Sequence, residues 1–401
     1  MEEVDKKAKI ESFLTRGVEN IIPGRAEVEK MLNSGKVLNV YLGIDPTATR
    51  IHLGHAFPLR KLQILADLGH HVTFLIGDFT ATVGDTSDKE GERPILSREQ
   101  IEENFKTYKR QAKKFLDFSK VELHFNSEWL SKLDFAAVLK LTRHFSLNDF
   151  ISRELIKKRL SEGKSVSLPE VLYPIMQGYD SMVMDTDIQI GGTDQIFNMQ
   201  AGRTLIHDLK EKESCIIANG FLSGTDGRKM SKTWGNAIWI EDSPEEIFGK
   251  VMSLNDGVIL TYFLMGTNVD QVVIDDAKKR LESKENPMEL KRELARVIVK
   301  ELCGKSEVEA AEEFFQKTVV EKVVDENAPK IKWDKDIVAV EDIIKMIVET
   351  GLATSNGEAK RLVEQGGVYL NEVRVEKNGG EIDVDKGIIR VGKRKYIKIV
   401  K

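Results

Sequence analysis

The feature that most constrains the fold is a strand–helix–strand pattern within the first eighty residues. Residues 37–44 (VLNVYLGI) and 72–77 (VTFLIG) are short apolar runs rich in β-branched side chains, which is typical of buried strands. The amphipathic stretch between them, 52–68, predicts a helix that ends at Gly69. Strands joined through a helix lie parallel, with a right-handed crossover. The chain is therefore predicted to contain an α/β domain built on a Rossmann-like parallel sheet.

The following residues indicate that this sheet is interrupted by helices. Ser97 and Gln100 form a capping-box pattern, which predicts a long helix over 97–118. Residues 121–125 have strand composition, and helical patterns fill 130–162. Two more strands are predicted at 187–190 and 215–218. We therefore expect residues 1–242 to form the α/β domain, with a helical insertion over about 97–170.

A new helix is predicted to begin at Ser243-Pro244, because serine is favoured at the N-cap and proline at the first helical position. Helical patterns continue to residue 325, and 326–336 have the composition of a linker. Residues 337–401 predict a compact α+β module, in which Ser355 and Glu358 form a second capping-box pattern. Asn371-Glu372 then separates two short strands of a hairpin.

Composition indicates a soluble chain in a reducing compartment. The 401 residues contain no apolar run of about 18 residues, the length that a membrane span needs. Cys215 and Cys303 are isolated, which argues against a disulfide framework or a structural metal. A cytoplasmic protein with no membrane contact is expected.

Charge is uneven along the chain. The net charge is −5, yet residues 337–401 carry +2. The last twelve residues contain six basic side chains and no acid. Such a tail is either a strand edge protected by lysines or a surface for a phosphate backbone.

Two separated elements suggest phosphate chemistry. His52-Leu53-Gly54-His55 lies where the first strand passes into a helix, and the N-terminus of a helix favours anions. The histidines could also bind a metal, although no third ligand is nearby, or only cap and pack. Residues 229–233 (KMSKT) follow a glycine-rich turn, and their lysines could act as point charges on a polyphosphate or simply be exposed.

These motifs resemble those of a known family. PTATRIHLGH and KMSKT are similar to the HIGH and KMSKS signatures of class I aminoacyl-tRNA synthetases. YLGIDPTATRIHLGH, FLIGDFTATVGDTS, VLYPIMQGYDS and IQIGGTDQIFN resemble the bacterial tyrosyl-tRNA synthetases more specifically. Residues 337–401 resemble an S4 RNA-binding module. The resemblance covers nearly the whole chain.

The resemblance implies a ligase that works in two steps. L-Tyrosine would react with Mg²⁺-bound ATP to give tyrosyl-AMP and pyrophosphate, and the tyrosyl group would then pass to the 3′ end of tRNA(Tyr). It further implies a homodimer, for which the 130–160 insertion is a plausible interface. Residues 243–325 and 337–401 would hold the tRNA.

The resemblance also implies a role for individual residues. Those expected to bind tyrosine are Tyr41, Asp85, Tyr173, Gln177, Asp180 and Gln195. Those expected to act on the phosphates during catalysis are Thr47, His52, His55, Lys229, Lys232 and Thr233. Those expected around ATP are Gly43, Asp45, Gly54, Gly192, Asp194 and Lys232, and a mobile loop would supply Lys89 and Arg93. Helical spacing independently places Tyr173, Gln177 and Asp180 on one face.

Three alternatives remain at this point. A tryptophanyl-tRNA synthetase shares the signatures, but an indole pocket has no use for both Tyr41 and Asp180. A ligase similar to pantothenate synthetase would not need residues 243–401. A non-catalytic RNA-binding paralogue would be expected to lose signature residues, which are all present here.

Overall fold

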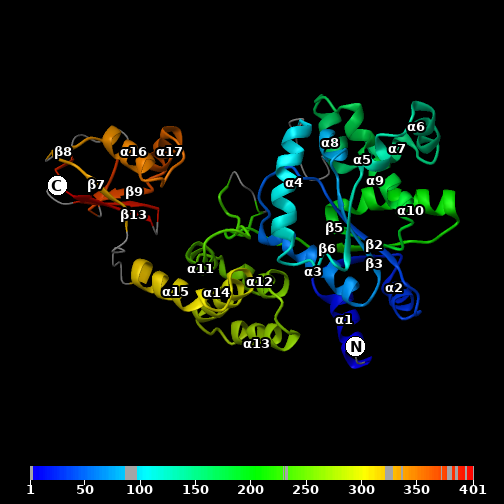
Figure 1. Ribbon diagram of the computed structural model, residues 1–401, viewed down its shortest axis with the longest axis horizontal. Coiled ribbons are helices and arrows are strands. Elements are labelled where there is room, and N and C mark those ends of the chain that lie inside the picture. Colours follow the sequence, from blue (N-terminus) through cyan, green and yellow to red (C-terminus); the bar gives the residue numbers. More distant parts are fainter. Residues whose placement is uncertain are drawn as a thin grey trace. The chain divides into compact units, whose positions relative to one another are not determined.

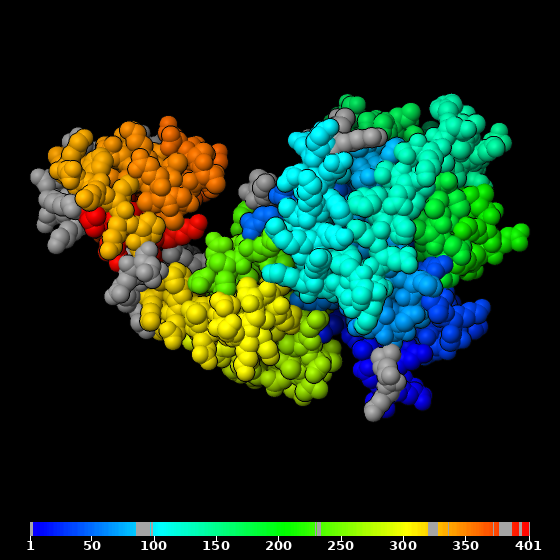
Figure 2. Space-filling view, in the orientation of Figure 1, coloured from blue at the N-terminus to red at the C-terminus, as the bar shows by residue number. Residues whose placement is uncertain are grey.

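The computed structural model describes residues 3–85, 97–228, 230, 234–320, 328–335, 337–371, 373–376, 382–383, 387–392 and 395–400. The chain divides into two compact units, residues 1–305 and 306–401. Figure 1 shows the helices and strands of each unit, and Figure 2 shows their packed surfaces. The boundary expected near residue 242 lies within the first unit.

A six-stranded sheet forms the centre of the first unit, in the order β1-β6-β5-β2-β3-β4. Its strands are β1 (Val18–Ile22), β2 (Asn39–Ile44), β3 (His71–Ile76), β4 (Val121–Phe125), β5 (Ile188–Gly192) and β6 (Cys215–Asn219). The pairs from β6 to β4 are parallel, which confirms the α/β prediction. One edge of the sheet differs from the rest, because β1 pairs antiparallel with β6.

Helices cover both faces of this sheet. One face packs against α1 (Glu3–Thr15), α2 (Arg25–Leu32) and α3 (Leu53–Asp67), through buried side chains such as Val40, Leu42 and Phe74. The other face carries α9 (Leu168–Val183) and α10 (Ile196–Lys210), which pack against each other. Because side chains alternate along a strand, Tyr41 points to the α9 face while Val40 and Leu42 point away from it.

The expected insertion is helical, with shorter helices than predicted. Helix α4 (Arg98–Ala112) begins with the predicted capping box, in which Gln100 N donates to Ser97 Oγ and Ser97 N to Gln100 Oε1. It ends at Ala112 rather than near 118, because turns at Phe115 and Leu116 bring the chain back to β4. The rest comprises α5 (Ser127–Leu130), α6 (Phe135–Thr142), α7 (Leu147–Ile151) and α8 (Glu154–Ser161).

The helices after residue 242 are α11 (Pro244–Met252), the short η3 (Asp256–Val258), α12 (Ile259–Gly266), α13 (Gln271–Glu282) and α14 (Pro287–Cys303). Ser243 caps α11 as predicted, since its Oγ accepts from Glu246 N at 3.2 Å. Among the described residues no single helix is long and apolar enough to cross a membrane; the bent pair α11 and η3–α12 meets that criterion by length and composition only.

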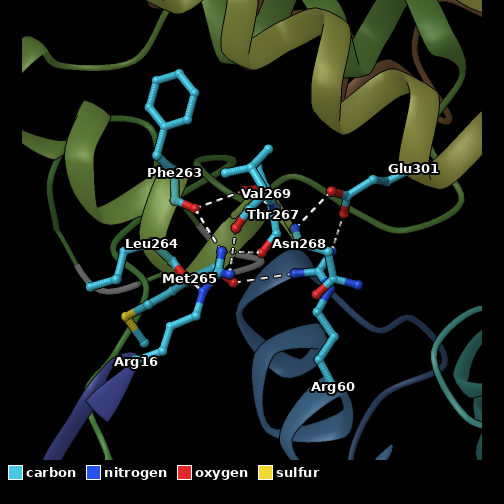
Figure 3. A network of polar contacts seen from close by, with 9 residues as sticks. All are labelled: Arg16, Arg60, Phe263, Leu264, Met265, Thr267, Asn268, Val269 and Glu301. Carbon is cyan, nitrogen blue, oxygen red and sulfur yellow. Dashed lines mark hydrogen bonds and ion pairs between the residues drawn. The ribbon is translucent and has the colours of Figure 1, made fainter. Parts of the chain in front are cut away.

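Two arginines connect these helices to the sheet-bearing part of the same unit (Figure 3). The last carbonyl groups of a helix lack partners within it. Arg16 donates to the carbonyl oxygens of Phe263 and Leu264 in the last turns of α12 and to those of Thr267 and Val269 just after it. Arg60 of α3 donates to Glu301 of α14 at 2.9 Å and to the Met265 carbonyl at 3.3 Å. Helix α3, which starts at His52, is thereby joined to α12 and α14.

The second unit contains α15 (Glu307–Phe315), a π-helical turn (Gln316–Val320), α16 (Val340–Glu349) and α17 (Asn356–Glu364). Its five-stranded sheet has the order β10-β9-β12-β13-β7, and β8 pairs with β11. The strands are β7 (Lys330–Lys332), β8 (Ile337–Val338), β9 (Val368–Leu370), β10 (Val373–Arg374), β11 (Ile382–Asp383), β12 (Gly387–Val391) and β13 (Lys395–Val400). Strand β7 lies within the segment expected to be a linker.

The predicted hairpin is present, since β9 and β10 pair antiparallel with Val373 opposite Leu370. The predicted capping box at α17 is only half correct. Ser355 Oγ accepts from Glu358 N, but the Glu358 carboxylate accepts from the backbone and hydroxyl of Thr354 instead of from Ser355.

Candidate active site

The predicted site residues that the structure describes gather at the carboxyl ends of the parallel strands. Asp45 and Thr47 follow β2, Asp85 follows the turn after β3, and Gly192 ends β5. Helix α9 supplies the opposite wall. The carboxyl edge of an open parallel sheet is where ligands bind in α/β proteins, so this edge is the candidate site.

Asp180 lies at the closed end of the site and is 2% exposed. Its Oδ1 accepts from the indole Nε1 of Trp129 at 2.6 Å, and its Oδ2 accepts from Asn126 Nδ2 at 3.1 Å. Burial raises the pKa of Asp180 to about 8, against the lowering effect of these two donors, and the carboxylates of Asp45 and Asp78 raise it further. The predicted buried and partnered acid is therefore present, and it carries a proton at neutral pH.

Tyr41 lies beside this acid but is not bonded to it. Its hydroxyl is 2.7 Å from Ser181 Oγ and donates to Gln189 Oε1 at 3.3 Å. Burial raises its pKa, and the nearby Asp180 adds to the rise. Ser181 also donates to the Gln177 carbonyl oxygen at 3.2 Å. Tyr41 and Asp180 thus present two separate polar groups at the same end of the site.

A chain of hydrogen bonds runs from the closed end toward the open edge. Asn126 donates to Thr80 Oγ1 at 3.0 Å, Thr80 donates to Asp45 Oδ1 at 2.8 Å, and the Tyr173 hydroxyl donates to Asp45 Oδ2 at 2.9 Å. Gly77 is required for this arrangement, because a Cβ there would lie 2.0 Å from Asp45 Oδ1. Asp45, expected around ATP, therefore also fixes Tyr173 in the tyrosine half of the site.

Asp85 and Gln195 form a second polar pair. Gln195 Nε2 donates to Asp85 Oδ2 at 2.6 Å, and Asn198 Nδ2 donates to Gln195 Oε1 at 3.0 Å. Asp85 is 7% exposed. Its negative charge contributes to the raised pKa of Tyr173 and opposes the lowering of the pKa of Arg153 by burial. Several carboxylates thus converge on this part of the site, which suits a positively charged amino group.

The two signature histidines lie at the start of α3. Their rings are stacked with centroids 3.8 Å apart, and His52 N donates to His55 Nδ1 at 3.4 Å. Removal from water lowers the pKa of His55 to about 4. A neutral His55 that accepts at Nδ1 carries its proton on Nε2, so it can donate one hydrogen bond without carrying a charge. Gly54 lets the His52 ring pack closely, because a Cβ there would lie 3.0 Å from His52 Nδ1.

The remaining described candidates line the open edge. Gly43 is an exposed residue of β2, and Thr47 is exposed just after this strand. Gly192 and Asp194 lie at the junction of β5 with the short helix η2 (Thr193–Gln195). A Cβ on Gly192 would lie 2.6 Å from Asp194 Oδ1, so a larger residue there would displace the Asp194 carboxylate.

The residues on both sides of the basic segment 229–233 (the basic loop) are held by hydrogen bonds. Asp226 Oδ1 accepts from Asn236 Nδ2 at 2.8 Å, and its carboxylate also accepts from the Arg228 side chain. These bonds lower the pKa of Asp226 to about 2. The Arg228 guanidinium lies 4.4 Å from the ring centre of Trp234. The predicted residues Lys229, Lys232 and Thr233, and also Lys89 and Arg93, lie outside the described residues.

Sequence reasoning missed several residues that shape the site, namely Gly77, Thr80, Asn126, Trp129, Ser181 and Gln189. One signal was available for Gln189, because a single polar side chain interrupts an apolar strand. Trp129 and Asn126 gave none, since each reaches Asp180 across more than fifty residues.

Comparison with known proteins identifies the class. A family model described as tRNA synthetases class I (W and Y) matches residues 33–320. Fold and site therefore define a class I aminoacyl-tRNA synthetase of the tryptophan and tyrosine group.

Full-length relatives narrow this assignment. The tyrosine–tRNA ligase of Thermotoga maritima is 38% identical over 390 residues, covering 96% of each chain. That of Carboxydothermus hydrogenoformans is 40% identical over 406 positions, covering 99% of each chain. The chain belongs to the tyrosine–tRNA ligase family, which confirms the resemblance and favours it over the tryptophanyl and pantothenate-synthetase-like alternatives.

Solved structures support the fold. The tyrosyl-tRNA synthetase of Archaeoglobus fulgidus, complexed with L-tyrosine, superposes with a TM-score of 0.61 at 23% identity, over 77% of this chain and 99% of that one. A truncated mitochondrial tyrosyl-tRNA synthetase of Aspergillus nidulans gives 0.65 at 22% identity, over 78% and 94%.

Proposed function

We propose that this chain activates L-tyrosine with ATP and transfers it to tRNA(Tyr), using the residues gathered at the carboxyl edge of the sheet. The observation that carries this proposal is the closed end of the site. There the Asp180 carboxyl, held by Trp129 and Asn126, lies beside the Tyr41 hydroxyl. Two buried polar groups suit a substrate hydroxyl, and a phenylalanine side chain would offer a hydrogen bond to neither of them.

The rest of the amino acid would lie along the hydrogen-bonded chain. Tyr173 and Asp85, with Gln177 beside them on α9, would receive the α-amino group, where the carboxylates favour a positive charge. The substrate carboxylate would then lie toward α3. It would attack the α-phosphate of ATP, forming the acyl–phosphate bond while the bond to pyrophosphate breaks.

The phosphates would be held by Thr47 and by the helix start at His52 and His55. The low pKa of His55 indicates that it acts as a neutral donor, so most of the positive charge would come from Lys229, Lys232 and the Mg²⁺ that accompanies ATP. Thr233, Lys89 and Arg93 would assist pyrophosphate binding, and Gly43, Gly54, Gly192 and Asp194 would border the nucleotide. No protein nucleophile is needed.

The test is ATP–pyrophosphate exchange with each of the twenty amino acids. Tyrosine alone should support exchange. Exchange with tryptophan would contradict the pocket assignment, and no exchange at all would favour a non-catalytic RNA-binding paralogue.

For tRNA we propose that residues 243–325 and 337–401 supply binding surfaces. One face of the second sheet presents cross-strand neighbours Arg374, Tyr369 and Arg390, and the Arg390 guanidinium lies 3.9 Å from the Tyr369 ring centre. On the same face Lys398 pairs with Ile388 and with Lys330. Basic and aromatic groups on one sheet suit a nucleic acid.

We also propose a homodimer formed through the insertion. Phe135 is 77% exposed and Leu139, one turn later on α6, is 51% exposed; Leu147 is 64% exposed. Apolar side chains gathered in this way mark an interaction surface. Phe135→Asp should give a monomer in sedimentation experiments. Val272→Asp, at a residue that is 78% exposed on α13, is the matched control and should leave the dimer intact.

The reaction belongs where protein synthesis takes place, and we propose the cytoplasm. Both cysteines, Cys215 and Cys303, are free thiols, as a reducing compartment allows.

A further inference from the structure

A short antiparallel pairing joins the start of the first signature (52–55) to residues 238–240, which follow the second signature (229–233). Leu53 N donates to the Ile238 carbonyl at 2.8 Å, and Ile240 N donates to the Ile51 carbonyl at 3.0 Å. Between these bonds His52 and Trp239 face each other as a β-bridge. The segment that follows the basic loop is therefore attached directly to the start of α3.

Trp239 also contacts the first signature through its side chain. The centre of the Trp239 ring lies 5.9 Å from that of the His52 ring. The His52 ring is also stacked on the ring of His55. The Arg50 guanidinium lies 4.8 Å from the Trp239 ring centre. The His52 imidazole thus lies beside two aromatic rings, which restrict its direction.

Asp242 holds Trp239 in place. Its side chain is 2% exposed, and it accepts from Trp239 N at 2.9 Å, from Arg50 at 2.6 Å and from Lys250 of α11 at 2.5 Å. A buried carboxylate with three donors is well compensated and rigid. It connects the turn at 239–242 to Arg50, two residues before the first signature, and to α11, which follows the second.

The other flank of the basic loop is tied to the same segment. Thr225 N donates to the Asn236 carbonyl at 2.9 Å, and Asp226 binds the Asn236 side chain at 2.8 Å. Both flanks of residues 229–233 therefore converge on residues 236–242, which are attached to His52.

We propose that Trp239, fixed by Asp242, is a positioning residue. It aligns His52 with the residues that flank the basic loop, so that both signature elements contact the ATP phosphates at the same time. The proposal rests on the proposed contact of His52 with ATP phosphates. It assigns no chemistry to Trp239 itself, because Trp239 acts through His52.

The test is a double-mutant cycle in the full-length chain, read by ATP–pyrophosphate exchange. Trp239→Leu should lower kcat by about 10- to 100-fold, as expected for misplacement of a catalytic group, with the KM for tyrosine unchanged. Trp239→Phe should recover most of the activity, because an aromatic ring is retained. In a His52→Ala background Trp239→Leu should have little further effect.

Asp242→Asn should produce a milder loss of kcat, and Glu241→Gln is its matched control. Glu241 is the adjacent residue and pairs with Arg110 on the surface at 2.8 Å, away from His52. Melting temperatures of all variants separate loss of fold from loss of alignment, and Asp242→Asn compared with Glu241→Gln keeps the test valid if Trp239→Leu does not fold.

The outcomes distinguish the two proposals. If His52→Ala leaves kcat unchanged, the proposed role of His52 fails and the positioning proposal fails with it. If His52→Ala lowers kcat but Trp239→Leu costs the same factor in both backgrounds, the role of His52 stands and the positioning proposal is overturned.

Discussion

The indole Nε1 of Trp129 donates a 2.6 Å hydrogen bond to Oδ1 of Asp180. A residue from the one-turn helix α5 of the insertion thus holds the acid that we propose to contact the tyrosine hydroxyl. This contact ties substrate selection to the segment that is also proposed as the dimer interface.

Replacement of Trp129 should weaken tyrosine binding. Trp129→Phe keeps an aromatic ring but removes the donor, so Asp180 would retain only Asn126. A hydrogen bond to a charged group contributes about 1.5–3 kcal/mol, so the KM for tyrosine should rise by roughly 10- to 100-fold above about pH 8, where Asp180 is ionised. Trp333→Phe, in the second unit, is the matched control and should not change it.

Selectivity should depend on Asp180. Asp180→Ala removes the group that a substrate hydroxyl would contact, so exchange with phenylalanine should rise relative to tyrosine. The ratio of kcat/KM for the two amino acids measures this change. An unaltered ratio would refute the assignment of Asp180 to the phenol.

The kcat/KM for tyrosine should depend on pH through Asp180. The pKa of Asp180 is about 8, so the carboxylate, which is the stronger acceptor, forms as pH rises from about 7 to about 9. The kcat/KM for tyrosine should increase over this interval. Asp180→Asn cannot ionise and should lose that component; a profile identical to the native one would argue against it.

The free energy of unfolding should fall as pH rises, whereas kcat/KM for tyrosine should increase. Asp180 has a folded pKa of about 8 against an ordinary value of 3.8, so the folded state binds its proton more tightly than the unfolded state. Its contribution to stability is complete below the unfolded pKa and is lost as pH rises through about 8. In urea unfolding, Asp180→Asn should therefore gain stability relative to the native chain between about pH 4 and pH 8.

The Arg60–Glu301 pair should stabilise the first unit. Arg60 is 7% exposed and Glu301 is 22% exposed. Arg60→Met would leave Glu301 without this partner, and breaking a buried pair costs about 3–5 kcal/mol of unfolding free energy. Lys120→Met, which breaks the exposed pair with Asp67, should cost no more than about 1 kcal/mol.

Much of the fold could be predicted because local patterns were strong. The β4 strand was predicted to the residue, since turn-forming residues bound its apolar run. Strand β1 was missed because Glu19 and Asn20 are exposed on it and obscure its alternation. The face of α9 carrying Tyr173 and Asp180 followed from helical spacing. Contacts such as Trp129 to Asp180 join distant parts of the chain, and no local pattern encodes them.

Arg16 has a consequence for anyone building chimaeric enzymes from this scaffold. The carbonyl oxygens at the end of α12 receive their donors from a residue near the N-terminus. A fragment that starts at residue 243 would leave those oxygens without Arg16, and a fragment that stops at 242 would leave the Arg16 guanidinium without these acceptors. The helices from residue 243 onward therefore cannot be exchanged as an independent domain. A chimaera that contains them must also contain Arg16 and Arg60.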